Sequence, residues 1–171
     1  MLAEHESVAF DLELLTEISQ FLYREARLQD THAYSEWEAL WTDDAIYWVP
    51  ANMTPGGEDI DPETQMSIIY DNRSRIALRV KQLYTGKRHT QMPASGLGRL
   101  LSNIEILGIE GGDVRVAANT MIFESSLRGD TVWATRNEYV LRRTEHGLRM
   151  ARKKVVLVNN DKALYTLSFL I

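Results

Sequence analysis

Residues 99–159 read RLLSNIEILGIEGGDVRVAANTMIFESSLRGDTVWATRNEYVLRRTEHGLRMARKKVVLVN, in which long β-like segments alternate with short, glycine-containing connections. The segments are Arg99–Ile109, Val114–Ser125, Thr131–Arg143 and Leu148–Asn159. In the third of them Trp133 and Tyr139 fall on one face, and the charged Arg136 and Glu138 fall on the other. A strand with one buried face needs this period of two. The pattern therefore predicts an antiparallel sheet whose strands are joined by hairpins.

The first half of the sequence is predicted to be mainly helical by the spacing of its apolar residues. The expected helices are Asp11–Asp30, Thr31–Trp41 and Asn72–Tyr84, with short strands at Ala45–Val49 and Met66–Tyr70. Helices followed by a strand meander predict an α+β fold, with N-terminal helices packed on one face of a curved antiparallel or mixed sheet. The proline-rich segment Pro50–Pro62 is expected to be an ordered loop. The 171 residues are therefore expected to form a single domain, 1–171.

The composition disfavours several kinds of protein. The sequence has no cysteine, which excludes disulfides, thiolate zinc sites, iron–sulfur clusters and cysteine nucleophiles. Nineteen Lys and Arg against 24 Asp and Glu give a net charge of −5, which disfavours binding to nucleic acid. No basic leader and no run of ~18 apolar residues occurs, so neither a signal peptide nor a membrane span is expected. These features predict a cytoplasmic protein.

Residue types that carry metal or acid–base chemistry are present without the spacing that the chemistry needs. A non-haem iron site usually takes two histidines and a carboxylate. No two of the four histidines stand at helix-ligand spacing; they are His5, His32, His89 and His146. The adjacent Asp43 and Asp44 are typical of a solvated helix end or turn.

The basic runs and glycine pairs also have ordinary interpretations. Arg142-Arg143 and Arg152–Lys154 are interpreted first as a solvated face, second as interface ion pairs and third as a phosphate site. No nucleotide-binding loop and no Gly-x-Ser-x-Gly motif occurs. The sequence thus predicts no catalytic, cofactor-binding or metal-binding residue in this chain.

A crowded polar junction lies where the second short strand meets the third helix. Asp71 or Asn72 can cap that helix. Arg75 and Arg79 share a helix face, where like charges repel, so the arginines of the junction are expected to meet acidic groups elsewhere. A structural or interface role is predicted for the junction and for two residues at the start of the main sheet. The candidates are Tyr70, Asp71, Asn72, Arg73, Arg75, Arg79, Arg99 and Asn103.

Several separate segments resemble the small (beta) subunit of aromatic ring-hydroxylating dioxygenases. They are Tyr23–Asp30 (YREARLQD), Tyr34–Trp37 (YSEW), Trp41–Pro50 (WTDDAIYWVP), Ile69–Arg73 with Arg79-Val80, and Arg99–Ile104. The resemblance runs from about residue 12 to residue 171 and keeps the order of the family's elements. Its specificity comes from the combination, because no single motif is sufficient.

The resemblance implies a fold, a partner and a reaction. The fold is the cone-like one shared with nuclear transport factors, ketosteroid isomerases and scytalone dehydratases. The partner is a large alpha subunit that carries a Rieske [2Fe–2S] cluster and a mononuclear Fe(II), commonly in an assembly of three alpha and three beta subunits. The reaction is dioxygenation of an aromatic ring in aromatic-compound catabolism, with electrons from NAD(P)H through a reductase and sometimes a ferredoxin.

The resemblance also implies that the beta subunit is a structural component without a metal, which self-associates as a trimer. The residue composition independently agrees that this chain does not hold the Rieske cluster. A Rieske centre needs two cysteines and two histidines. A chain without cysteine must leave that cluster to its partner.

Two other functions remain open, because a fold does not decide a function. The first is a free-standing cone-fold isomerase or dehydratase. Ketosteroid isomerases carry a carboxylate base directly before a proline at the end of the first strand; the matching position here is Val49, which cannot take a proton. A dehydratase would draw on His89 with Tyr34 or Tyr47. The second is a module that binds a small ligand inside its cone.

Overall fold

The computed structural model describes residues 11–51, 61–64, 66–85, 93–162, 164 and 167–171. Within these residues the helices are α1 (Leu12–Asp30), α2 (Tyr34–Glu38) and α3 (Arg73–Tyr84). The strands are β1 (Trp41–Pro50), β2 (Ser67–Asn72), β3 (Gly96–Glu110), β4 (Asp113–Ser126), β5 (Gly129–Thr144) and β6 (Gly147–Leu157).

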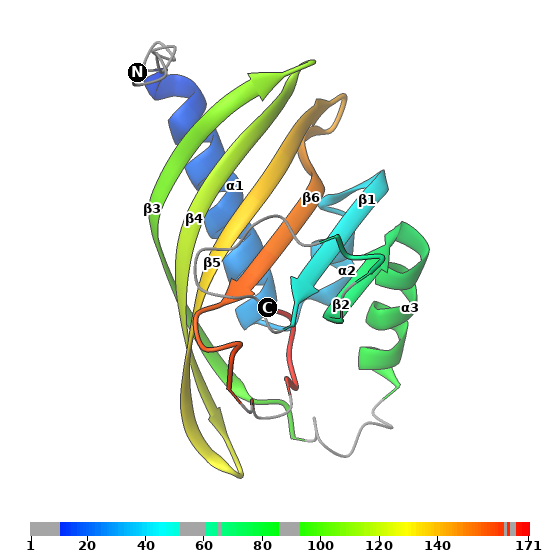
Figure 1. The fold of residues 1–171 in the computed structure, drawn as a ribbon, viewed down its shortest axis with the longest axis vertical. Helices are drawn as coiled ribbons and strands as arrows, with labels where there is room; N and C mark the ends of the chain where they lie inside the picture. Colours follow the sequence, from blue (N-terminus) through cyan, green and yellow to red (C-terminus); the bar gives the residue numbers. More distant parts are fainter. Residues whose placement is uncertain (1–10, 52–60, 65, 86–92, 163, 165–166) are drawn as a thin grey trace.

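The strands form one mixed sheet in the order β2-β1-β6-β5-β4-β3. From β3 to β6 each strand pairs antiparallel with the next, while β1 pairs parallel with β6 and antiparallel with β2. Figure 1 shows the long strands β3, β4 and β5 curving strongly, with α1 across one face of the sheet and α3 beside β1 and β2. The predicted α+β fold, with helices on a curved mixed sheet, is confirmed.

The hairpins of the meander follow the glycine pattern of the sequence. At the β3–β4 turn Gly111 and Gly112 have φ of 59° and 88°, in the region that side-chain-bearing residues rarely adopt. Strands β4 and β5 bury every second residue over most of their length, while β3 alternates between exposed and half-buried residues. In β5 these buried residues include Trp133 and Tyr139, whereas Arg136 and Glu138 are exposed. The predicted alternation is therefore confirmed.

The core lies between α1, α2 and the inner face of the sheet. Helix α1 begins at Asp11, whose carboxylate accepts a hydrogen bond from the backbone N–H of Leu14 (2.9 Å). The rings of Trp37, Trp41 and Tyr47 meet with centroids 5.3–5.8 Å apart. Aromatic pairs at such distances add about 0.5–1.5 kcal/mol beyond their burial, so this cluster fixes α2 against the first strand.

The predicted second helix is wrong at both ends. Helix α2 spans only Tyr34–Glu38, and Trp41 already belongs to β1, where it pairs with Met150 of β6. The backbone N–H of Met150 donates to the carbonyl of Leu40 (2.7 Å). This pairing with a strand far along the chain overrides the local helical period. The predicted helix end at Thr42–Asp44 consequently lies within the strand.

The remaining boundaries differ by a few residues. Strand β3 begins at Gly96 rather than residue 99, and β6 ends at Leu157 rather than residue 159. Strand β2 is displaced to Ser67–Asn72, and Asn72 caps α3. Most of the Pro50–Pro62 loop, together with His5, Gly86 and His89, lies outside the described residues.

Candidate functional site

Asp71 and Asn72 stabilise the junction between β2 and α3 through different contacts. The side-chain oxygen of Asn72 accepts from the backbone N–H of Arg75 (3.1 Å) and from the hydroxyl of Ser74 (2.8 Å). Asn72 is therefore the helix cap, while the buried Asp71 accepts from the Arg79 guanidinium (2.7 Å).

The arginines of the junction behave differently from one another. Arg73 pairs with Glu38 of α2 (2.8 Å) and Arg79 with Asp71, so the predicted acidic partners are present for these two. Arg75 is exposed and donates to the carbonyl of Tyr70 (3.3 Å), and no acidic side chain among the described residues pairs with it, contrary to the expectation. The ring of Tyr70 packs edge-on against Trp48 on the outer face of the sheet.

Arg99 and Asn103 lie away from this junction, on β3. The Arg99 side chain is 2% exposed; it contacts the Asp30 carboxylate and the carbonyl of Leu170. It also lies over the ring of Phe169 (5.6 Å) and so joins α1, β3 and the C-terminal segment. Asn103 has a φ of 54° where the register of β3 shifts, which bends the strand. The structure therefore places the eight predicted residues in separate regions and forms no single site from them.

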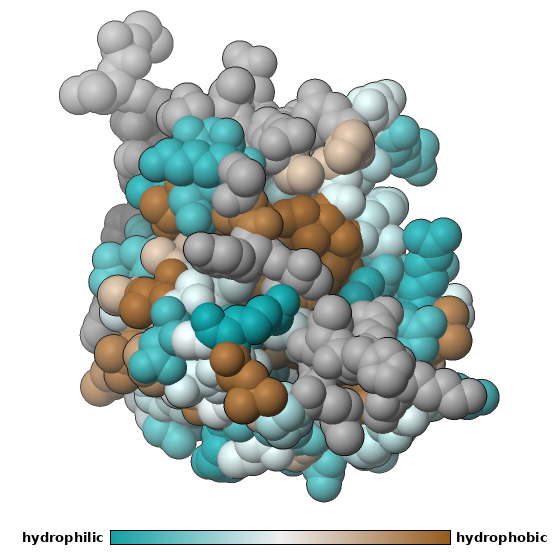
Figure 2. All heavy atoms as spheres, turned by 90° about the horizontal axis from the view of Figure 1, so that it is seen from below, coloured by the Kyte–Doolittle hydropathy of each residue, from teal (hydrophilic) through white to brown (hydrophobic). Residues whose placement is uncertain are grey.

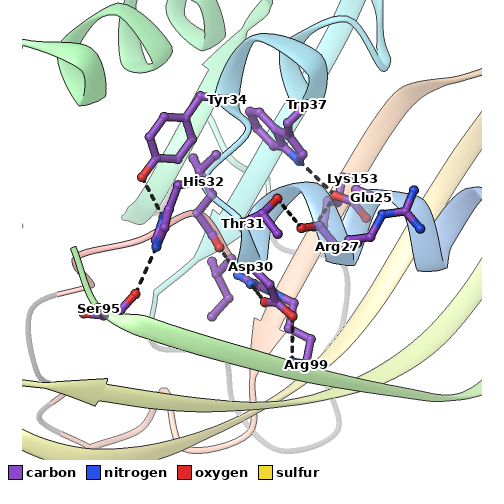
Figure 3. Close-up of polar contacts among 12 residues, drawn as sticks. Glu25, Arg27, Asp30, Thr31, His32, Tyr34, Trp37, Ser95, Arg99 and Lys153 are labelled. Carbon is purple, nitrogen blue, oxygen red and sulfur yellow. Dashed lines mark hydrogen bonds and ion pairs between the residues drawn. The ribbon is translucent and has the colours of Figure 1, made fainter.

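An ion pair lies buried in the interior of the cone, and sequence reasoning missed it. Lys153 Nζ is 2.7 Å from Glu25 Oε1, which also accepts from the indole N–H of Trp37 (3.2 Å; Figure 3). Both charged side chains are at most 3% exposed. Burial lowers the pKa of Lys153, and the Glu25 carboxylate opposes this shift. The interpretation of Arg152–Lys154 as a solvated face is therefore wrong at Lys153, and it is wrong at Lys154 too, which is buried over the ring of Trp48 on the opposite face.

The alternation of inward and outward residues along β6 could have indicated that Lys153 is buried. Lys153, Val155 and Leu157 share the inner face of β6, and both apolar neighbours are fully buried. A lysine in phase with buried residues needs a carboxylate opposite it. Glu25 lies on the buried side of α1, beside Leu22 and Ala26.

His32 and Tyr34 connect the segment between α1 and α2 to the residue that precedes β3. The two ring nitrogens of His32 contact the Tyr34 hydroxyl (2.9 Å) and the carbonyl of Ser95 (2.9 Å; Figure 3). Burial is the main cause that raises the pKa of Tyr34. Tyr47 is fully buried, with its hydroxyl bonded to the backbone of Ile171, and burial raises the pKa of Tyr47. These hydroxyls are therefore held in structural contacts.

Between α1 and the inner face of the sheet, the residues that the structure describes leave almost no free volume. The cavity there measures about 10 Å³, and the buried Ile171 lines it. Phe169 and Leu170 line a separate cavity of about 90 Å³ beside β2 and α3. Val49, at the position of the isomerase base, is completely buried. Space for about one water molecule is not enough for a steroid-sized or aromatic ligand.

The outer face of the sheet carries an exposed apolar patch. In the sheet register, Leu100 faces Met121, and Phe123 faces Val132 in the adjoining row. Leu100 is 75% exposed, and the other three are about half exposed. Val158, also exposed, joins the patch because its N–H donates to Ala134, which pairs with Met121. We call Leu100, Met121, Phe123, Val132 and Val158 the outer patch.

Figure 2 shows the molecule from below, the end at which the β4–β5 hairpin lies in Figure 1. Apolar side chains are exposed there in groups among hydrophilic ones. Contiguous exposed apolar surface on a folded chain typically marks an interaction site.

A charged network lies at the other end of the strands, near the β3–β4 and β5–β6 turns. Arg142 of β5 binds Asp113 of β4 through two hydrogen bonds (2.9 and 2.8 Å) and Asp44 of β1 through two more (3.0 and 2.9 Å). Thr42 also donates to Asp44 (2.7 Å). Hydrogen bonds from Thr42 and Arg142 lower the pKa of Asp44, and Arg142 lowers the pKa of Asp113. Asp44 thus has a structural partner, whereas Asp43 is simply exposed.

This network predicts an acid-dependent loss of stability. Both carboxyl pKa values lie below the ordinary 3.8 in the folded state. Their contribution is therefore complete above about pH 4 and is lost as the pH falls through the lowered values. Urea unfolding between about pH 6 and about pH 2 should show Arg142→Met with a flatter decline than the wild type. Arg115→Met, which removes only a 3.4 Å exposed contact, should decline like the wild type. Equal declines for both variants would contradict the assignment.

In the part of the chain that the structure describes, no three histidine, aspartate or glutamate side chains gather in a way that could hold a metal ion. No helix in the same part is long and apolar enough to cross a membrane.

Comparison with known families decides which protein family has this geometry. The family model described as "Ring hydroxylating beta subunit" matches residues 24–161. The chain belongs to this family. This ring-hydroxylating beta subunit is 32% identical over 161 residues to the anthranilate 1,2-dioxygenase small subunit of Acinetobacter baylyi, covering 92% of the chain and 97% of that protein. It is also 31% identical to the small oxygenase component of the p-cumate 2,3-dioxygenase system of Pseudomonas putida, covering 83% and 78% of the two chains.

Solved structures support the same family and fold. The beta subunit of benzoate 1,2-dioxygenase from Burkholderia mallei matches this beta subunit with a TM-score of 0.71 and 26% identity, over 88% of the chain and 93% of that structure. A putative scytalone dehydratase from Novosphingobium aromaticivorans matches with a TM-score of 0.63 and 13% identity, over 85% and 84%. The second likeness concerns the fold alone. The predicted family and the cone-like fold are both confirmed, and the chain is a subunit of an aromatic ring dioxygenase with an alpha oxygenase partner.

Proposed function

We propose that this beta subunit is the structural scaffold of a terminal oxygenase and contributes no catalytic residue. The observation that carries the proposal is the combination of a filled interior with an exposed outer patch. The cavity has no room for an aromatic substrate, while the outer face offers apolar surface for association. The alpha partner would hold the Rieske cluster and the mononuclear Fe(II), and it would receive electrons from a reductase with or without a ferredoxin.

The proposed assembly contains three alpha and three beta subunits in the cytoplasm, with the chain folding as one domain, 1–171. Three copies of the beta subunit would meet through their outer patches about a threefold axis, since a closed ring leaves no growing edge. The junction residues Tyr70, Asp71, Asn72, Arg73 and Arg79, with the exposed Arg75, are proposed to order this region or to contact the alpha subunit. Arg99 and Asn103 are proposed to be structural.

The substrate class of the complex is proposed to be an aromatic carboxylate. The relatives that are 31–32% identical are named for p-cumate, anthranilate and toluate, all of which are ring carboxylates. Relatives named for benzene and biphenyl are 27% and 25% identical. Turnover assays of the reconstituted system with anthranilate, benzoate and biphenyl test this order, and turnover of biphenyl alone would contradict it.

Co-expression with the large subunit tests the scaffold proposal directly. The beta subunit should co-purify with the alpha subunit, native mass measurement should give three of each, and iron should be found only in the separated alpha subunit. An isolated monomer with isomerase or dehydratase activity, and without co-purification, would overturn the proposal.

A substitution in the outer patch tests the proposed trimer interface. Met121→Asp should dissociate the beta trimer in sedimentation velocity measurements, because an interface that buries a lone carboxylate without a partner loses free energy. Leu78→Asp on α3 is the matched control, since Leu78 is 53% exposed and Met121 54%. The control should remain trimeric. A trimeric Met121→Asp protein, or dissociation by the control instead, would show that the interface lies elsewhere.

A further inference from the structure

Three polar atoms in the interior of the cone have no hydrogen-bond partner in the protein among the described residues. They are Gln29 Nε2 on α1, and Thr135 Oγ1 and Asn137 Oδ1 on β5. Each of the three residues is at most 5% exposed. All three line the same cavity of about 10 Å³. Buried polar groups are normally paired, so a convergence of three unpaired ones around one cavity indicates a bound group.

The chemistry of the three atoms restricts what that group can be. The amide of Asn137 is oriented by its Nδ2, which donates to Thr120 Oγ1 (2.9 Å) and to the Tyr139 hydroxyl (3.3 Å). Its Oδ1 is therefore an acceptor, Gln29 Nε2 is a donor, and the Thr135 hydroxyl can act as either. A metal cation would be repelled by the Gln29 amide hydrogens, and an anion by the Asn137 oxygen. The three charged residues that line the cavity are all paired: Glu25 with Lys153 at 2.7 Å, and Arg99 with Asp30.

We propose that the cone interior binds one ordered water molecule at this place. The water accepts from Gln29 Nε2, donates to Asn137 Oδ1 and makes its third hydrogen bond to Thr135 Oγ1. A cavity of this volume takes about one water, and an internal water typically makes about three such bonds. The site links the middle of the sheet to α1. In this chain it gives the interior of a cone-like fold a specific solvent site in place of a ligand pocket.

A crystal structure of the assembled oxygenase, at a resolution that shows ordered waters, tests the proposal. The wild type should show one fully occupied peak in each beta subunit, within about 2.7–3.2 Å of all three atoms. The double variant Gln29→Met, Thr135→Val should lose that peak, since both replacements keep the volume and remove two of the three partners. The control double variant Gln20→Met, Thr131→Val changes the same residue types away from the cavity and should keep it.

The wild-type structure decides the question even if the double variant does not fold. A cavity without density in the wild type would overturn the proposal. A peak that persists unchanged in the double variant would also overturn it, because the water would then be held by other groups. The scaffold function does not depend on either outcome.

Discussion

Lys153→Met will lower the free energy of unfolding of the beta subunit by about 3–5 kcal/mol. The substitution keeps most of the side-chain volume but removes the ammonium group from a site that is almost completely buried. Glu25 would then be a buried carboxylate without a counter-charge, although the indole N–H of Trp37 still donates to it. Removing one partner of a buried ion pair is costly because the other charge stays desolvated without compensation.

Urea unfolding followed by tryptophan fluorescence measures this loss. The double variant Glu25→Gln, Lys153→Met should recover most of it, because a neutral amide oxygen still accepts from Trp37 and no lone charge remains. Arg143→Met is the control: it removes an exposed pair with Glu17 and should leave the stability close to that of the wild type. A double variant as unstable as Lys153→Met alone would show that the charge is not the cause.

Arg99→Met will cost a similar amount, about 3–5 kcal/mol, and will in addition free the C-terminal segment. Its guanidinium is buried against the Asp30 carboxylate and the carbonyl of Leu170, and it lies over Phe169. The variant leaves Asp30 with the backbone N–H of residue 99 and removes one of the contacts that hold the segment, while the Tyr47 hydroxyl still bonds to the backbone of Ile171.

Unfolding curves and amide hydrogen exchange of residues 167–171 measure the two effects together. Arg75→Met provides the matched control, because Arg75 is exposed and contacts the carbonyl of Tyr70; its effect should stay within about 0.5 kcal/mol. Arg99→Met with protected C-terminal amides and an unchanged stability would contradict the assignment.

Local patterns predicted those parts of the fold in which neighbours along the chain decide the structure. The alternation in residues 131–143, the turn glycines and the Asn72 cap each act within a few residues. The family followed from the combined motifs of the resemblance, whereas the same residues taken singly left an isomerase or a ligand-binding module open.

Long-range partners explain what could not be predicted. Lys153 meets Glu25 across 128 positions, and Arg99 meets Asp30 and Leu170 across about 70 positions in opposite directions along the chain. Trp41 became a strand residue because Met150 pairs with it. None of these partners has a local signature. The strand phase of Lys153 indicated only that some carboxylate had to face it.

The parallel pairing of β1 with β6 has a consequence for how the chain is made on the ribosome. The first strand of the sequence obtains its inner neighbour only when the last strand has been synthesised. The hairpins of β3 to β5 can form earlier, because their contacts are close in sequence and cost little loop entropy. Until residue 157 leaves the exit tunnel, the tryptophan-rich N-terminal half therefore lacks its partner strand β6. Its apolar surface stays exposed during that interval, when protection by chaperones matters most.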